Sequence, residues 1–408
     1  MTLDDAQALD AADHLAACRG HFQLPPDIVY LDGNSLGALP VATAGRVAEL
    51  IERQWGKDLI ASWNKHGWIE APQRIAAKLA PLIGAKPNEV LVADSTSINL
   101  FKLLAAAIAA RPGRNTILSE TGNFPTDLYI AEGLVGLCPN IRLKTVEADT
   151  IEAAIDADTA VLMLTQVDYG SGRRHDLAAL TGAAHRAGAL ILWDLSHSAG
   201  AIEVDLNDAD CDLAVGCGYK YLNGGPGAPA FLFIAEALQP TLATPLSGWM
   251  GHADPFAFEP NYRPRDGIAR FLSGTPSIIA LTSLDAGLDS FVGTTMTAIE
   301  AKSRALSQAF IDQVETRCSG EVALASPRDP VTRGSHVSFA HPNGYAVIQA
   351  LIARGIIGDF RAPDLMRFGF APLYNGFEDV WRAADTLADI LATRAWDKEC
   401  FHARGQVT

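Results

Sequence analysis

The sequence predicts an α/β fold: a large domain built on a mostly parallel sheet flanked by helices, followed by a small α+β domain. Short apolar runs alternate with helical stretches throughout residues 90–235, which is the pattern of βαβ units. After Ile234 the pattern changes to glycine-punctuated loops, long helices and two further strands. A chain of 408 residues is long enough for one large and one smaller domain.

The apolar residues follow two periods along the chain. Short continuous apolar runs bounded by turns are typical of strands buried on both faces, whereas spacings of three and four residues indicate helices. Strands are expected at 28–31, 90–93, 116–119, 160–164, 189–193, 211–215, 229–234, 337–339 and 366–370. Helices are expected at 4–18, 41–55, 98–111, 177–188, 277–291 and 296–317. No internal repeat or low-complexity tract interrupts this order.

The composition excludes several classes of function. The net charge is −15 without a basic block, which argues against nucleic acid and against an anionic membrane surface as partners. No apolar run approaches the length of a membrane span, and the acidic N-terminus does not resemble a signal peptide. The cysteines form no C-x-x-C pair, so we expect no metal site. We therefore expect a cytoplasmic protein with reduced cysteines.

Two polar positions near the N-terminus allow more than one interpretation. Asn34 and Ser35 lie in a turn between two glycines, where ordinary turn chemistry explains them. His66 lies between Trp63 and Trp68, and a lone histidine is more often structural than functional. A contact with a substrate is the alternative in both cases, and the residues alone leave it open.

Hydroxyl side chains follow the strand expected at 90–93. Ser95, Thr96 and Ser97 directly precede the helix expected at 98–111, where hydroxyl residues are ordinary N-terminal caps. The first N–H groups of a helix also attract anions, because they lack partners within the helix and lie at the positive end of its dipole. Capping and phosphate binding are compatible at this position.

An acid and a lysine follow two neighbouring strands. Asp194 ends the apolar run at 189–193, and Lys220 follows the run at 211–215. Ligands of open α/β sheets bind at the carboxyl ends of strands. Pyridoxal 5'-phosphate (PLP) needs a lysine for its Schiff base and an acid that keeps its pyridine nitrogen protonated. Either residue alone is explained by a buried cap or a surface lysine, but their joint position favours a PLP site.

Several motifs extend this inference over most of the chain. They are LDGNSLG at 31–37, FPTD at 124–127, WDLSHS at 193–198, YKYLNG at 219–224 and PLYN at 372–375. With these motifs the chain resembles fold type I PLP enzymes of the class V aminotransferase group, and within that group the kynureninases. The resemblance implies a seven-stranded sheet in a large PLP-binding domain at 41–290, a small C-terminal domain at 291–408, and an N-terminal segment at 1–40 that packs with the small domain.

The resemblance also implies roles for individual residues. Lys220 would hold the cofactor and then move the substrate's α-proton, Asp194 would contact the ring nitrogen, and Tyr219 is a candidate acid for the β-carbon. Further cofactor contacts are expected from Thr96, Ser97, Phe124, Pro125, Thr126, Asp127, Thr165, His197, Trp249 and Thr275. Substrate contacts are expected from Arg367, which matches the carboxylate-binding arginine of the group, and from Asn34, Ser35 and His66.

The implied reaction is hydrolysis of L-kynurenine to anthranilate and L-alanine through a PLP ketimine, in tryptophan breakdown, with 3-hydroxy-L-kynurenine as a further candidate substrate. The resemblance implies a homodimer with shared sites, in which Trp249 and Thr275 reach the phosphate of the neighbouring subunit. An aminotransferase and a PLP-binding protein without turnover are alternatives. A cysteine desulfurase is disfavoured, because only Cys318 and Cys400 follow Lys220 and neither lies in a glycine- and serine-rich loop.

Overall fold

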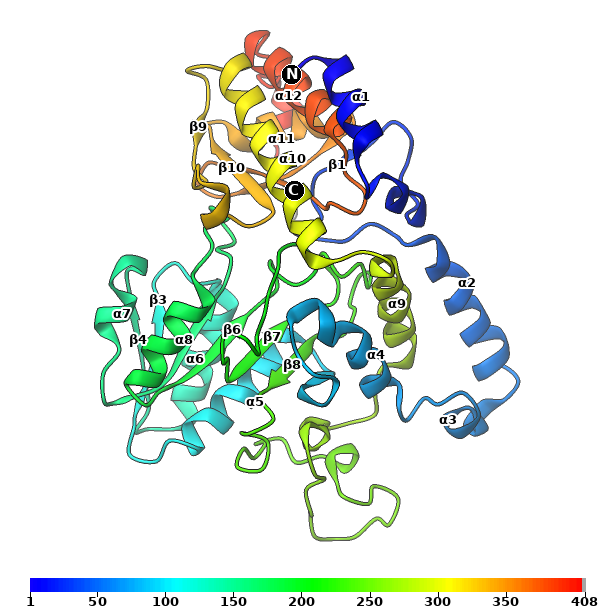
Figure 1. Cartoon of the computed structure of the whole chain (residues 1–408), viewed down its shortest axis with the longest axis vertical. Coiled ribbons are helices and arrows are strands. Elements are labelled where there is room, and N and C mark those ends of the chain that lie inside the picture. Colours follow the sequence, from blue (N-terminus) through cyan, green and yellow to red (C-terminus); the bar gives the residue numbers. More distant parts are fainter. Residues whose placement is uncertain (406–408) are drawn as a thin grey trace.

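The computed structural model describes residues 1–405, and a seven-stranded sheet forms the centre of its larger part (Figure 1). The strand order is β2-β8-β7-β6-β5-β3-β4. Only β8 runs antiparallel to its two neighbours, and the other pairs are parallel. The strands are β2 (Val90–Val92), β3 (Thr116–Glu120), β4 (Arg142–Val146), β5 (Thr159–Thr165), β6 (Leu190–Asp194), β7 (Leu213–Gly216) and β8 (Phe231–Ile234). The mostly parallel sheet expected from the sequence is confirmed.

Both faces of this sheet are buried, as continuous apolar strands require. Along β6, Leu190 and Leu192 pack against helices on one side of the sheet, whereas Ile191 and Trp193 pack against helices on the other side. Trp193 is fully buried. The helices of this part are α2 (Val41–Glu49), α3 (Ser62–Lys65), α4 (Ala71–Leu79), α5 (Thr96–Ala109), α6 (Pro125–Leu137), α7 (Ile151–Ala154), α8 (Leu177–Arg186) and α9 (Ile278–Leu288).

The C-terminal part has its own sheet and core, above the large sheet in Figure 1. Its four strands are antiparallel in the order β12-β13-β10-β9. They are β9 (Ala323–Leu324), β10 (His336–Ala340), β12 (Asp359–Arg361) and β13 (Leu365–Gly369). Its helices are α10 (Met296–Arg317), α11 (Gly344–Ile352), α12 (Phe377–Ala392) and α13 (Glu399–His402). The long helix α10 rises from the large part into this core (Figure 1).

The N-terminal segment contacts the C-terminal part. Strand β1 (Val29–Tyr30) pairs with β11 (Ile356–Ile357), and α1 (Leu3–Ala12) packs against α12. The Asp10 carboxylate accepts the backbone N–H groups of Phe377 and Glu378 at 2.6 and 2.9 Å, so it caps α12 from a distant part of the sequence. The domain division at residues 40/41 and 290/291 stays a prediction.

Some elements of the structure differ from those that the sequence patterns predict. Strand β4 is the edge of the large sheet and is partly exposed, so Arg142 and Lys144 interrupt its apolar pattern. Helix α6 begins at Pro125, in a stretch that the sequence presented only as a motif. The helix expected at 41–55 changes after Glu49 into a π-helical turn, Leu50–Trp55. Within residues 1–405, no helix is long and apolar enough to cross a membrane.

Candidate active site

A cavity of about 230 Å³ lies where the carboxyl ends of the parallel strands meet. Its walls come from the segments that follow β2, β3, β5, β6 and β7. The lining residues are Thr96, Ser97, Phe124, Thr126, Asp127, Thr165, Tyr169, Asp194, Ser196, His197, Tyr219 and Lys220. Pro125 begins α6 beside this cavity. The fold therefore brings the expected cofactor contacts other than Trp249 and Thr275 into one place, and their individual roles stay predictions.

The turn that carries Asn34 packs directly onto the lysine segment. The Gly37 N–H donates to the Tyr219 carbonyl oxygen at 2.8 Å. A Cβ atom on Gly37 would clash with the carbonyl oxygen of Lys220, so only glycine allows this approach. The motifs at 31–37 and 219–224 thus form one packed unit, which explains why the N-terminal turn lies next to the candidate lysine.

His197 lies next to the lysine amine, and His336 packs against His197. His197 Nε2 lies 2.9 Å from Lys220 Nζ and 3.1 Å from the Asn34 carbonyl oxygen. Burial, together with the Lys220 charge, holds the pKa of His197 well below its ordinary value. The His336 ring meets the His197 ring edge-on at 5.3 Å, and burial lowers the pKa of His336 to about 3. The imidazoles therefore add no positive charge beside the amine at neutral pH.

Asp194 is a buried carboxylate held by its own turn. Ser196 donates to Asp194 Oδ1 twice, from its backbone N–H at 2.8 Å and from its hydroxyl at 2.6 Å. Burial raises the pKa of Asp194, and these hydrogen bonds and the Lys220 charge oppose the shift. Burial and the neighbouring Asp194 raise the pKa of Asp127 well above its ordinary value. A cationic N–H group would stabilise this pair of acids.

The other end of the cavity combines a helix start with an aromatic ring. Ser95 caps α5 by accepting the Ile98 N–H at 3.4 Å, which leaves Thr96 and Ser97 in its first turn. Phe124 precedes α6, and its ring meets the Tyr169 ring edge-on at 5.3 Å. An anion suits the helix start, and a flat ring suits the exposed face of an aromatic side chain.

The chemical groups of this cavity match the functional groups of PLP, one for each part of the cofactor. The cavity contains a primary amine for the aldehyde, a buried carboxyl group for the ring nitrogen, and hydroxyl and N–H groups for the phosphate. The buried Asp194, whose pKa burial raises, is the group that a protonated pyridine would stabilise. The donor set of the cavity is therefore compatible with this cofactor.

Sequence reasoning missed three residues of this site. Asn123 Oδ1 accepts the Phe124 N–H at 2.9 Å and the Thr165 N–H at 3.2 Å, so it joins two predicted cofactor contacts. Tyr169 and Ser196 line the cavity. Each of the three lies within four residues of a predicted contact, and polar side chains just beyond strand ends were the available signal.

Arg367 is already engaged in an ion pair. Its guanidinium donates from Nε to Asp359 Oδ1 at 2.7 Å and from Nη2 to Asp359 Oδ2. It also donates to the Tyr169 carbonyl oxygen and, at 3.3 Å, to Ser35 Oγ. The side chain is 1% exposed. Asp359 therefore occupies the two guanidinium N–H donors that were expected to bind a substrate carboxylate. The role of Arg367 in substrate binding stays a prediction.

The structure of a single chain does not bring three predicted residues to the Lys220 cavity. His66 pairs with Asp58 at 2.8 Å and lines a different pocket beside α2, α4 and α9. Trp249 is 41% exposed and packs against Phe256 and Phe258 in the unlabelled yellow-green loop that extends below the large sheet in Figure 1. Thr275 lines a third pocket. The sequence cannot separate contacts within a chain from contacts made across an interface.

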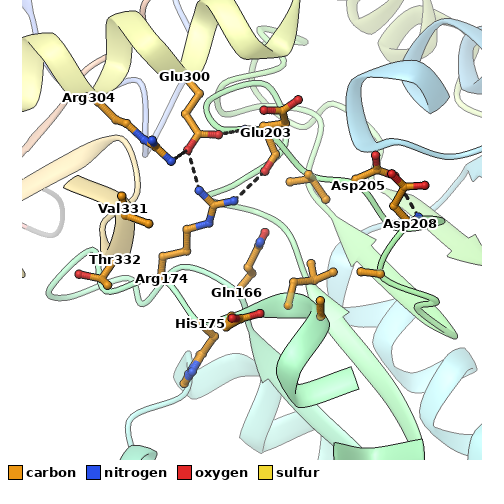
Figure 2. Close-up of a pocket in the computed structure, with 15 residues that line it drawn as sticks. Gln166, Arg174, His175, Glu203, Asp205, Asp208, Glu300, Arg304, Val331 and Thr332 are labelled. Carbon is orange, nitrogen blue, oxygen red and sulfur yellow. Dashed lines mark hydrogen bonds and ion pairs between the residues drawn. The ribbon is translucent and has the colours of Figure 1, made fainter. Parts of the chain in front are cut away.

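A larger pocket, of about 520 Å³, lies between the two parts of the molecule (Figure 2). Its charged groups are mostly paired with each other. Glu300 on α10 accepts Arg174 Nη1 at 2.7 Å and the Glu203 N–H at 2.7 Å, and it also contacts Arg304. Figure 2 shows these side chains joined across the crevice. The network holds the two parts together, and the pocket contains none of the residues predicted for the site.

The fold and the Lys220 cavity define the class of this protein: it is a fold type I enzyme, the class that uses PLP. Solved structures support the fold. The cysteine desulfurase from Thermococcus onnurineus NA1 matches with a TM-score of 0.79 at 20% identity, over 92% of this chain and 98% of that chain. A variant of C-DES with glycine covalently linked to its PLP cofactor matches with a TM-score of 0.79 at 18% identity, over 91% and 99%.

Sequence relatives define the family more narrowly. A kynureninase from Pseudomonas fluorescens is 51% identical over the full length of both chains, and one from Burkholderia mallei (strain SAVP1) is 52% identical over the full length of both. The family model for the kynureninase C-terminal domain matches residues 299–387. The chain belongs to the kynureninase family.

The buried neutral histidines predict how stability depends on pH. His336 and His197 have depressed pKa values in the folded protein, so only the unfolded chain gains protons at these residues as the pH falls below the unfolded pKa of about 6.5. The free energy of unfolding is therefore undiminished above that pH and decreases below it. At pH 5.5, His336 alone should cost about 1.4 kcal/mol. We expect His336→Gln to reduce the fall in Tm between pH 7.5 and 5.5, measured by calorimetry. His14→Gln, at an exposed position, should keep the wild-type slope; equal slopes in all three proteins would contradict the assignment.

Proposed function

We propose that this protein is a PLP-dependent kynureninase that hydrolyses L-kynurenine to anthranilate and L-alanine, with 3-hydroxy-L-kynurenine as a second candidate substrate. The observation that carries the proposal is the single cavity that contains Lys220, Asp194 and the first turn of α5, in a chain of the kynureninase family. We place its activity in the cytoplasm, which the six free cysteines support.

The reaction divides between the cofactor and the side chains of the cavity. Bound PLP supplies an electron sink for negative charge on the substrate. Lys220 would hold the cofactor, and its Nζ would also be the base that takes the substrate's α-proton. His197 Nε2 lies 2.9 Å from that amine and orients it. Asp194 would keep the ring nitrogen of bound PLP protonated, from a buried position where the low dielectric constant strengthens the interaction.

Tyr219 is the proposed acid for the β-carbon. It is the neighbour of Lys220 in sequence, and both residues line the cavity. Burial raises the pKa of Tyr219 above its ordinary value, so the phenol keeps its proton at neutral pH. For the substrate carboxylate we propose Arg367, which must then exchange part of its contact with Asp359; Ser35, hydrogen-bonded to both, is placed to assist.

Cysteine desulfurase activity is not favoured, although the solved structures with this fold include such enzymes. A desulfurase needs a reactive cysteine thiolate. Cys318 is 3% exposed, and burial raises its pKa to about 11. Cys400 lies on the short helix α13 in the C-terminal part, away from any glycine- and serine-rich loop.

We further propose a homodimer with shared sites. Large apolar side chains are exposed on two projections of the chain: Trp55, Leu59 and Ile60 near α2 and α3, and Trp249, Phe256 and Phe258 in the loop after β8. Exposed apolar surface of this kind marks an interface. A two-fold dimer that covers both projections should bury more than about 2,000 Å². It would allow Trp249, Thr275 and His66 to reach the neighbouring cavity.

The identity of the lysine gives the first test. We expect Lys220→Ala to lose covalent PLP attachment and anthranilate formation, because no other amine lines the cavity. Borohydride reduction followed by peptide mapping locates the label, and anthranilate fluorescence reports turnover of L-kynurenine. The exposed lysine variant Lys398→Ala, in the C-terminal part, is the control and should behave as wild type. A label on another lysine, or formation of a keto acid in place of alanine, would contradict the proposal.

The acid at the ring nitrogen gives the second test. We expect Asp194→Asn to retain PLP and to lose at least about a hundredfold in kcat, roughly 3 kcal/mol, because an amide does not hold the nitrogen protonated. Asp212→Asn is the matched control. Asp212 is also buried, but it lies at the amino-terminal end of β7, away from the cavity, and pairs with His185. Near-normal turnover of Asp194→Asn would show that Asp194 has another role.

Subunit exchange tests the shared sites. Chains with Lys220→Ala and chains with Trp249→Ala should each be poorly active, and mixing them should restore activity, since one site of the heterodimer carries both defects and the other carries neither. Lys220→Ala mixed with Asp194→Asn is the control and should stay inactive, because both residues line the cavity of their own chain. Proven exchange without recovery in the first mixture would exclude the shared-site dimer.

A further inference from the structure

A fully buried lysine lies on the helix that begins at the candidate phosphate loop. Lys102, on α5, is 0% exposed. Its Nζ donates to Asp94 Oδ2 at 2.5 Å and to the Phe271 carbonyl oxygen at 2.7 Å. Burying an ammonium group is costly unless it is paired and hydrogen-bonded. Lys102 does not line the Lys220 cavity. Since its burial is energetically costly, we expect this ammonium group to have a structural role near that cavity.

Asp94 is the residue that this ammonium holds. It follows β2 and has φ = 50°, a left-handed conformation that residues other than glycine rarely adopt. Its carbonyl oxygen accepts the Ala230 N–H at 2.9 Å. Asp94 therefore sets the direction in which the chain leaves the sheet and enters the turn that presents Thr96 and Ser97.

The same turn is fixed by other side chains on one face of α5. Ser95 caps the helix, and Asn99 Nδ2 donates to the Ala93 carbonyl oxygen at 2.9 Å. Positions 95, 99 and 102 are spaced by four and three residues, so they lie on one side of the helix. Lys102 supplies the charged member of this set, and its pair with Asp94 joins the first turns of α5 to the end of β2.

The second partner of Lys102 belongs to another functional segment. Phe271 ends a short helical turn, Ile268–Phe271, and Thr275 follows shortly after it. A cavity of about 270 Å³ has Asp94 on one wall and Ser273, Gly274 and Thr275 on another. Gly248 packs against Ser273, and a Cβ atom there would clash with the Ser273 backbone, so the segment with Trp249 is attached as well.

We propose that Lys102 is a positioning residue for the PLP phosphate: it fixes the loop that presents Thr96 and Ser97 in its own subunit and anchors the segment that brings Thr275 to the neighbouring subunit. The proposal rests on the proposed function and its shared sites. One ammonium thereby links the two halves of the phosphate site, each of which serves a different active site of the dimer. Lys102 acts through Asp94 and Phe271 and does not touch the cofactor.

The test compares binding of PLP and of pyridoxal, which lacks the phosphate. Both are titrated into apoenzyme and followed by the absorbance of the Schiff base with Lys220. The ratio of the Kd for pyridoxal to the Kd for PLP measures how tightly the phosphate is held. We expect Lys102→Met to lower this ratio at least tenfold by weakening PLP while pyridoxal binding stays the same. A parallel loss for both ligands, or no loss, would overturn the proposal.

The chain offers a matched control. Lys302 on α10 is 9% exposed and pairs with Asp13 at 2.7 Å, so it forms a buried ion pair of the same kind in the C-terminal part. Lys302→Met should lower the Tm and leave the ratio of Kd values unchanged. If Lys102→Met does not fold, Asp94→Asn keeps the shape of the pair and should lower the ratio in the same direction; an unchanged ratio in that variant would overturn the proposal.

Hybrid dimers separate the two links. Pairing a wild-type chain with a chain that carries Lys102→Met and Lys220→Ala leaves one competent site, whose own loop is intact and whose borrowed segment is altered. Pairing Lys102→Met with Lys220→Ala gives the reverse arrangement. Both hybrids should release PLP faster than the hybrid of wild type with Lys220→Ala. Faster release only in the second hybrid would overturn the link to the Thr275 segment. Wild-type protein that binds no PLP would instead refute the proposed function.

Discussion

The burial of charge at one edge of the large sheet is the constraint on which the rest of the structure depends. Asp194 is 3% exposed at the end of β6, and burial raises its pKa. Such a carboxyl group is tolerable only with fixed partners, since an unpaired charge in a medium of low dielectric constant is strongly destabilising. Ser196 provides two hydrogen bonds from the same turn, and the Lys220 charge favours the ionised form. The cofactor's ring nitrogen supplies the remaining partner in the proposed function, so binding would complete an arrangement that the fold already prepares.

The parallel strands direct this arrangement to one end of the sheet, and the loops that follow the strands carry its other residues. Thr165 lies opposite Asp194 in the register of β5 and β6, and Asp194 lies opposite Val215 in the register of β6 and β7. Side chains that end these strands therefore meet at one edge without a long connection. The antiparallel strand β8 lies between β7 and β2, which places the loop after β2 on the same edge as Lys220. Lys102 then fixes that loop through Asp94, so the site depends on a residue that does not line it.

The junction between the two parts of the molecule combines apolar packing with charged side chains: Ala371, Leu373 and Tyr374 share the buried core of the large sheet. Arg174 and Glu300 pair across the crevice of Figure 2, and Arg367 of β13 donates to the carbonyl oxygen of Tyr169. Tyr169 lines the Lys220 cavity, so the position of the C-terminal part is transmitted directly to the site.

Patterns along the chain by themselves determined the α/β class, the buried strands and the conjunction of Asp194 with Lys220, because these depend on local periodicity and on the rule that ligands bind at strand ends. They did not determine β4, whose edge position tolerates Arg142 and Lys144, or the pairing of Arg367 with Asp359, which needs the register of β12 and β13. They also did not separate His66, Trp249 and Thr275 from the residues that line the cavity of one chain. Only the tertiary structure decided these points, since the partner of a long polar side chain is selected by distance and burial in the folded molecule, and neither quantity is encoded in the spacing of residues along the chain.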